Sequence, residues 1–108
     1  MVNSRAKGYR VERKIRQLFE KHGWLVIRAG RSLGDADLLC LKNKKCMLLQ
    51  IKSTAKEKFY YYGFAGKNIS GFPFYLVVDF GYGDIRILPP KRSVTKNEGN
   101  NIKEFLNK

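Results

Sequence analysis

Residues 37–52 read DLLCLKNKKCMLLQIK, two apolar runs joined by a short polar segment at residues 42–45. Apolar runs on either side of a short polar turn predict an antiparallel β-hairpin. We take the turn to be centred between Asn43 and Lys44, so that Lys42 faces Lys45 and Leu41 faces Cys46. The segment therefore predicts two paired strands, residues 37–41 and 46–52.

This register brings polar side chains together at the open end of the hairpin. Asp37 faces Gln50, and directly opposed residues project to the same side of an antiparallel pair. Lys52 joins that side because side chains alternate along a strand. The other side of the second strand carries an apolar row, which we expect in the core: Met47, Leu49 and Ile51. We expect Gln50 and Lys52 at the rim.

An aspartate oxygen and a glutamine oxygen are hard ligands of the kind that Mg²⁺ accepts. A metal ion there would polarise a phosphodiester, and Lys52 would orient water or offset charge. The alternative is structural: Asp37 caps a loop, while Gln50 and Lys52 occupy a solvated strand end. Both interpretations stay open on spacing alone.

A helix is predicted over residues 5–22, with Gly23 as its C-terminal stop. Glu12 lies only ~20° around this helix from Phe19, at the edge of the apolar stripe. It therefore points toward the sheet and is a further candidate oxygen ligand. Its alternative role is an ion pair with Arg16 one turn away.

The rest of the chain predicts further strands and a polar end. Residues 24–28 form a β-rich run followed by a loop, and residues 74–80 and 85–88 form a second hairpin. The aromatic cluster at residues 59–64 has no assignable secondary structure. Residues 91–101 are polar, and we leave residues 91–108 open as a flexible tail whose last apolar residues dock a helical turn. These are Ile102, Phe105 and Leu106.

The charge of the chain points to a polyanionic partner. Its 108 residues carry 22 Lys and Arg against 9 Asp and Glu, a net charge of +13. The basic residues recur along the whole chain, which favours nucleic acid over a membrane surface. No apolar stretch approaches a membrane span, so we expect one intracellular, cytoplasmic domain over residues 1–108. Cys40 and Cys46 fit neither a zinc pattern nor a disulfide framework, so we expect reduced core cysteines.

Taken together, these residues resemble the archaeal Holliday-junction resolvases of the PD-(D/E)XK nuclease superfamily. The resemblance covers residues 7–52 most specifically: GYRVER at 8–13, HGWLVIRAG at 22–30, DLL at 37–39 and QIK at 50–52, where the family has Glu-x-Lys. It implies an α/β fold with a restriction-endonuclease-like core, a mixed five-stranded sheet flanked by helices. An archaeal or viral source fits this family.

The resemblance also implies site residues. Catalytic roles fall to Glu12, Asp37, Gln50 and Lys52, and metal binding to Glu12, Asp37, Gln50 and Ile51, with Mg²⁺ as the ion and Mn²⁺ as its substitute. The resemblance puts Arg13, Arg28 and Ser32 near the scissile phosphate, and we add Arg31 from the same loop as a DNA contact. The basic run at the start of the chain adds Arg5, Lys7 and Arg10 as phosphate contacts. Most residues of the aromatic cluster are expected to pack in the core, and Phe64 is kept as a candidate to stack on unpaired bases. Gln50 departs from the family's glutamate, which removes one negative charge from the site. That change fits a natural branch, an inactive relative or a mutated protein.

The expected function is a structure-selective DNA endonuclease of recombination and repair. It would act as a homodimer and resolve four-way Holliday junctions by Mg²⁺-dependent phosphodiester hydrolysis, because a two-fold substrate suits a two-fold dimer. One alternative is a catalytically silent nucleic-acid-binding module of the same fold. Another is a related nuclease that acts on flaps, nicks or single strands.

Overall fold

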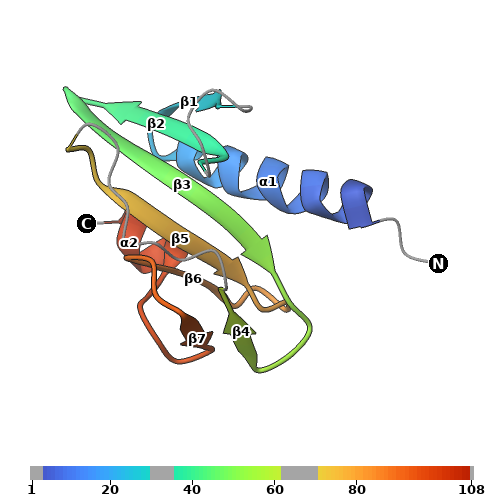
Figure 1. The fold of residues 1–108 in the computed structure, drawn as a ribbon. Coiled ribbons are helices and arrows are strands. Elements are labelled where there is room, and N and C mark those ends of the chain that lie inside the picture. The colour runs from blue at the N-terminus through green and yellow to red at the C-terminus, as the bar shows by residue number, and fades with distance from the viewer. Residues whose placement is uncertain (1–3, 30–35, 62–70, 108) are drawn as a thin grey trace.

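The structure is a computed structural model that describes residues 4–29, 36–61 and 71–107 (Figure 1). Its short strands lie in the sequence between one helix near each end. In chain order they are α1 (Ser4–Lys21), β1 (Leu25–Arg28), β2 (Leu38–Lys42), β3 (Lys45–Ser53), β4 (Lys58–Tyr60), β5 (Phe74–Asp79), β6 (Ile85–Leu88), β7 (Ser93–Thr95), β8 (Asn100–Asn101) and α2 (Ile102–Leu106).

The main sheet is mixed, as predicted. Within the described ranges it holds six strands in the order β1-β2-β3-β5-β6-β8. β3 and β5 pair in parallel at its centre, and the other neighbours pair antiparallel. The expected α/β class is therefore confirmed, and the sheet is one strand wider than the five expected because β8 adds to the edge of β6.

Different layers cover the two faces of the sheet. On one face, Ile15 and Phe19 of α1 join Met47 and Leu49 of β3 in a core cluster that also takes in α2. On the other face, β4 and β7 form a two-stranded sheet, and Figure 1 shows them together on the side of β5 and β6 away from α1. Among the described elements both helices therefore pack on one face.

The predicted hairpin forms with the predicted register. Lys42 pairs with Lys45, and the pairing continues to Leu38 opposite Leu49. Asn43 and Lys44 both have positive φ, 50° and 67°. Two successive positive φ angles belong to the tight turn whose twist matches a β-hairpin.

The end of α1 explains how the chain enters the sheet. Gly23 has a φ of 87°, its N–H donates to the carbonyl of Glu20, and the N–H of Trp24 donates to the carbonyl of Phe19. This is a Schellman cap, with the expected apolar contact: the rings of Trp24 and Phe19 meet edge to face at 5.9 Å. The predicted glycine stop is confirmed.

The segment left open as a tail contributes β7, β8 and α2. Gly99 lies so close to β6 that a Cβ there would meet the carbonyl oxygen of Ile87 at 2.8 Å, and its φ is 69°. Ile102 and Leu106 are buried, and the ring of Phe105 meets Tyr75 at 5.5 Å. The predicted docking of the last apolar residues is confirmed. In the described ranges, no helix is both long and apolar enough to cross a membrane.

Candidate functional site

Asp37 lies directly before β2 and leaves the regular ladder. Its N–H donates to the carbonyl of Leu49 at 2.7 Å, and its carboxylate Oδ2 accepts from the N–H of Ile51 at 2.7 Å. The N–H of Ala29 donates to the carbonyl of Asp37 at 3.0 Å, which fixes the end of β1 beside it. Asp37 therefore binds the backbone of β3 through its side chain, and its carboxylate lies at the open end of the hairpin.

Gln50 lies at the centre of β3, beside Leu76 of β5. Its exposed fraction is 7%, so the expectation of a rim position is wrong. Oε1 accepts a hydrogen bond from the hydroxyl of Tyr61 at 3.0 Å. The Gln50 side chain can be buried because the aromatic cluster supplies this hydrogen-bond partner. The sequence did not predict it, because the structure of the aromatic cluster could not be assigned from sequence.

Lys52 projects to the same face of β3 as Gln50, because strand side chains alternate. Lys52 pairs in register with Val78 and is half-buried. The side chain of Ile51 projects to the helix side and packs against the core. Only the backbone of Ile51 is therefore available to a ligand. We call Asp37, Gln50 and Lys52 the hairpin site.

Glu12 reaches from α1 to the end of β1. Its Oε1 accepts a hydrogen bond from Nε of Arg28 at 2.7 Å, so its structural partner is Arg28. The Arg28 guanidinium also lies over the ring of Tyr9, 5.4 Å from the centroid. Arg28 pairs in register with Leu38, the residue after Asp37. Glu12 and Arg28 therefore lie toward the same end of the sheet as Asp37.

The donor chemistry at this end suits a hard cation. It comprises the carboxylate of Asp37 and the amide oxygen of Gln50, and the carboxylate of Glu12, held by Arg28, lies toward the same end of the sheet on the α1 side. Oxygen donors of this kind match Mg²⁺ or Mn²⁺. The described residues contain no cluster of three or more His, Cys, Asp or Glu side chains positioned for a metal.

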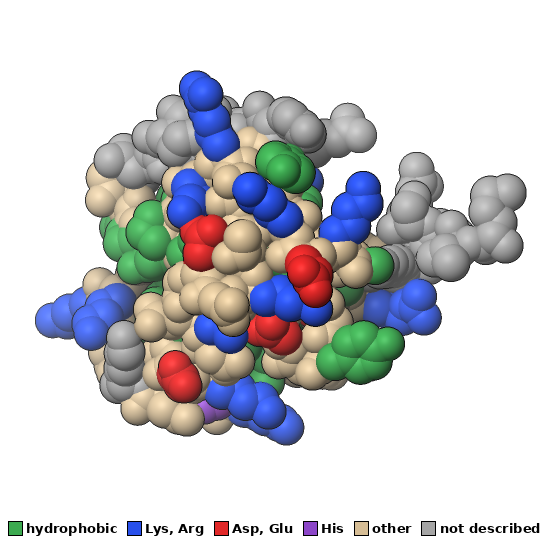
Figure 2. Space-filling model, turned by 90° about the horizontal axis from the view of Figure 1, so that it is seen from below, with side chains coloured by type: hydrophobic (Ala, Val, Ile, Leu, Met, Phe, Trp, Pro, Cys, Tyr) green, Lys and Arg blue, Asp and Glu red, His purple; other side chains and the backbone are tan. Residues whose placement is uncertain are grey.

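The predicted DNA-contacting residues fall into three groups. Arg10, Arg13 and Arg28 are exposed. Arg5 and Lys7 belong to the first turns of α1, and Arg31, Ser32 and Phe64 lie outside the described residues. Figure 2 shows Lys and Arg side chains spread over one face of the molecule, with acidic side chains between them.

Two residues with clear structural roles were missed by the sequence patterns. Tyr61 was one of five aromatics in a cluster with no assigned strand, and only the fold directs its hydroxyl to Gln50. Asp79 is buried and bonds Lys14 of α1 at 2.9 Å through Oδ2 and the N–H of Gly81 at 2.8 Å through Oδ1. The sequence signal that could have identified Asp79 is its position as an acidic residue near the end of an apolar strand.

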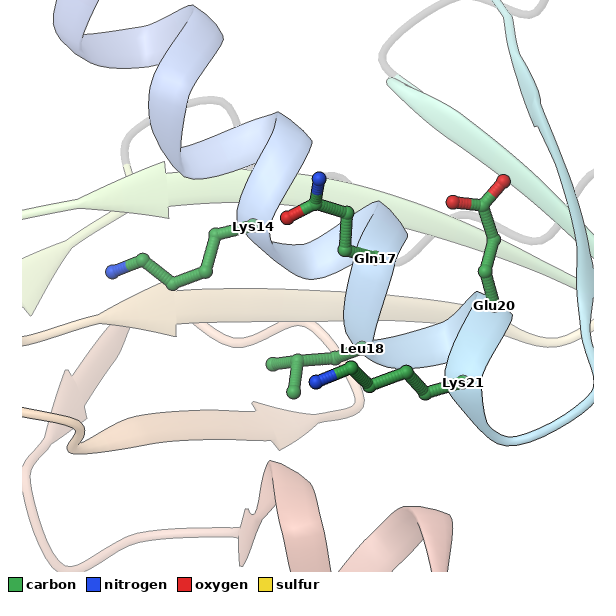
Figure 3. Close-up of a pocket in the computed structure, with 5 residues that line it drawn as sticks. All are labelled: Lys14, Gln17, Leu18, Glu20 and Lys21. Atoms are coloured by element: carbon green, nitrogen blue, oxygen red, sulfur yellow. The ribbon is translucent and has the colours of Figure 1, made fainter.

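A broad open hollow of about 650 Å³ lies along α1 (Figure 3). Figure 3 shows Lys14, Leu18 and Lys21 extending on one side of the helix, with Glu20 pointing away. The hollow contains no residue of the hairpin site. It is wide open to solvent.

Both cysteines are free, as expected. Cys40 is buried in the main core, whereas Cys46 is partly exposed on the opposite face of the hairpin. Burial raises the pKa of the Cys40 thiol to about 12, and the neighbouring Cys46 adds to this effect.

Comparisons with known proteins agree on one family. The model described as archaeal Holliday junction resolvase (Hjc) matches residues 3–101. The crossover junction endodeoxyribonuclease Hjc of Methanocaldococcus jannaschii is 37% identical over 54 residues, which cover 50% of this chain and 40% of that protein. The solved structure of Hjc from Archaeoglobus fulgidus, a Holliday junction resolvase, matches with a TM-score of 0.73 at 18% identity, over 94% of this chain and 97% of that one. This last likeness shows a shared fold.

Proposed function

The chain belongs to the archaeal Holliday-junction resolvase family, and we propose that it is a metal-dependent endonuclease that cuts four-way DNA junctions. The observation that carries this proposal is the hairpin site. The aspartate directly before β2 accepts the N–H of Ile51, the middle residue of the Gln-x-Lys on β3, and the two motifs follow in the family's order. The strongly basic chain, with its net charge of +13, suits a DNA substrate.

Asp37 and Gln50 would hold the metal ion. Glu12 and the backbone carbonyl of Ile51, which follows Gln50 on β3, would be further oxygen donors. When bound, Mg²⁺ or Mn²⁺ supplies Lewis-acid polarisation of the phosphodiester and a more acidic water. Lys52 adds a positive charge on the face of Gln50, where it stabilises negative charge that develops on the phosphate.

Arg28 supports the site through Glu12. Its guanidinium holds the Glu12 carboxylate at 2.7 Å and keeps more than half of its own side chain exposed, at 55%. An exposed arginine toward this end of the sheet can donate hydrogen bonds to a phosphate, and Arg10 and Arg13 are further exposed arginines on α1. These residues position the DNA backbone and do not specify its sequence.

We further propose a homodimer, so that two sites cut the two symmetric strands of a junction. Leu25 and Ile27 of the edge strand β1 are 60% and 44% exposed. Their register partners are Leu41 and Leu39, which places all four side chains on the face opposite α1. Exposed aliphatic side chains on a sheet face of a highly charged chain suit burial against a second copy.

The decisive experiment compares end-labelled four-way, flap, nicked, single-stranded and linear DNA at one salt concentration, with Mg²⁺, with Mn²⁺ and with chelator. We expect metal-dependent paired cuts in the four-way junction and much slower cutting of linear duplex. If the protein instead prefers flaps, nicks or single strands, the proposed nuclease activity stands and its proposed substrate changes to that DNA structure.

A second candidate function is a catalytically silent module that binds branched DNA. The neutral Gln50 and the lack of a three-acid cluster among the described residues favour it. Retained junction binding with no cleavage in either metal, while Gln50→Glu gains cleavage, would establish this second candidate.

A further inference from the structure

Tyr61 and Gln50 form a buried polar pair on the face of the sheet that carries the hairpin site. Their exposed fractions are 8% and 7%. The Tyr61 hydroxyl donates to Oε1 of Gln50 at 3.0 Å. A buried amide oxygen without a partner is costly, so this hydroxyl satisfies a group that the fold removes from water.

The small sheet β4–β7 holds Tyr61 in place. The N–H of Tyr61 donates to the carbonyl of Arg92 at 2.7 Å, directly after the pairing of Tyr60 with Ser93. The Tyr61 ring lies 6.4 Å from the ring of Phe59 and packs in one cluster with β5 and β6 residues. Backbone and ring contacts therefore fix the hydroxyl above β3.

This contact matters because an amide, unlike a carboxylate, has only one oxygen. A carboxylate presents an oxygen on either branch, whereas a glutamine that turns by half a revolution presents NH₂ to a cation and ceases to be a ligand. The hydrogen bond from Tyr61 fixes which branch carries the oxygen. A carbonyl oxygen has two lone pairs, so accepting from the phenol leaves one for a hard cation.

We propose that Tyr61 is a positioning residue that orients the amide of Gln50 for metal binding. A glutamate at position 50 would not need this hydrogen bond, because either of its oxygens could face the metal ion. The inference rests on the proposed metal site. It adds Tyr61 as a hydrogen-bond partner of Gln50, which the sequence alone did not predict.

The test measures binding of Mn²⁺ alone, by the electron paramagnetic resonance signal of the free ion during titration. Four proteins are compared: wild type, Tyr61→Phe, Gln50→Glu and the double variant. Tyr75→Phe is the matched control, because Tyr75 is a partly buried tyrosine that packs on Phe105 on the other face. Thermal unfolding confirms that each variant is folded at the titration temperature.

We expect Tyr61→Phe to weaken Mn²⁺ binding about tenfold, the usual scale for loss of an outer hydrogen bond to a ligand. In the Gln50→Glu background the same change should cost less than about threefold, because either carboxylate oxygen can serve, so the two effects are coupled. The metal concentration for half-maximal junction cleavage should move in parallel, with a smaller change in the rate at saturating metal.

Other outcomes separate this proposal from the proposed function. Equal Mn²⁺ affinities for Tyr61→Phe and Tyr75→Phe would overturn the positioning role while leaving nuclease activity intact. An equal loss in both backgrounds, or a wild type that binds no Mn²⁺, would also overturn it. A Tyr61-dependent Mn²⁺ site in a protein that cuts no DNA would support the positioning role and refute the nuclease.

Discussion

Asp37→Ala removes the acceptor that the N–H of Ile51 uses at 2.7 Å. Hydrogen bonds to a charged group contribute about 1.5–3 kcal/mol. Ile51 is only partly buried, so water replaces some of that contribution and the lower end applies. A loss of about 1.5 kcal/mol in the free energy of unfolding lowers the Tm by roughly 6–12 °C in a domain of this size.

Asp37→Asn is the matched variant, because it keeps an acceptor oxygen and loses the charge. We expect its loss of stability to be smaller, about 1 kcal/mol or less, since a neutral acceptor makes a weaker hydrogen bond. Both variants should lose at least about a hundredfold in cleavage rate, because in the proposed site Asp37 is a metal ligand, and removing such a ligand forfeits several kcal/mol of transition-state stabilisation.

The assay is single-turnover cleavage of a labelled four-way junction, run well below the Tm of the weaker variant. Junction binding is measured in chelator, where phosphate contacts dominate and both variants should match wild type. Wild-type cleavage by Asp37→Asn would refute the hairpin site, and the chemistry would then have to depend on other carboxylates, beginning with Glu12.

Three further outcomes are expected. Gln50→Glu should lower the Mg²⁺ concentration for half-maximal cleavage, because an added carboxylate attracts the cation; a higher requirement would count against shared ligation. Leu25→Lys should shift the protein from dimer to monomer in light scattering, and an unchanged dimer would place the contact on another surface. The slope of log K for junction binding against log salt should be steeper than about −3, and a shallower slope would leave too few phosphate contacts.

The hairpin was predictable because its information is local. Turn residues and alternation set the register, and Lys42 opposite Lys45 follows from the residues between them. The helix end was predictable for the same reason, since a glycine after the last apolar position determines the cap. Local rules also gave the second hairpin, because β6 spans the predicted residues Ile85–Leu88.

The parts that escaped prediction depend on contacts between distant segments. Gln50 looked like a strand-end residue because nothing near it in sequence supplies a partner, and Tyr61 directly follows β4, which belongs to a different sheet. β8 joins the main sheet only because Gly99 allows its backbone close to β6. Polar composition suggested a flexible tail, but a two-residue strand and a five-residue helix need few apolar side chains to dock.

The burial of Gln50 also explains why a neutral residue suits this position in the protein without metal. Asp37 directly precedes the neighbouring strand β2, and its carboxylate already accepts the N–H of Ile51, the residue after Gln50. A second carboxylate at a position with 7% exposure would face a like charge and lose most of its hydration. Glutamine avoids both costs and keeps an oxygen donor, so in the proposed metal site attraction of the cation would fall to Asp37. With less negative charge in that site, the orientation of the single amide oxygen would be decisive, which is the role that we propose for Tyr61.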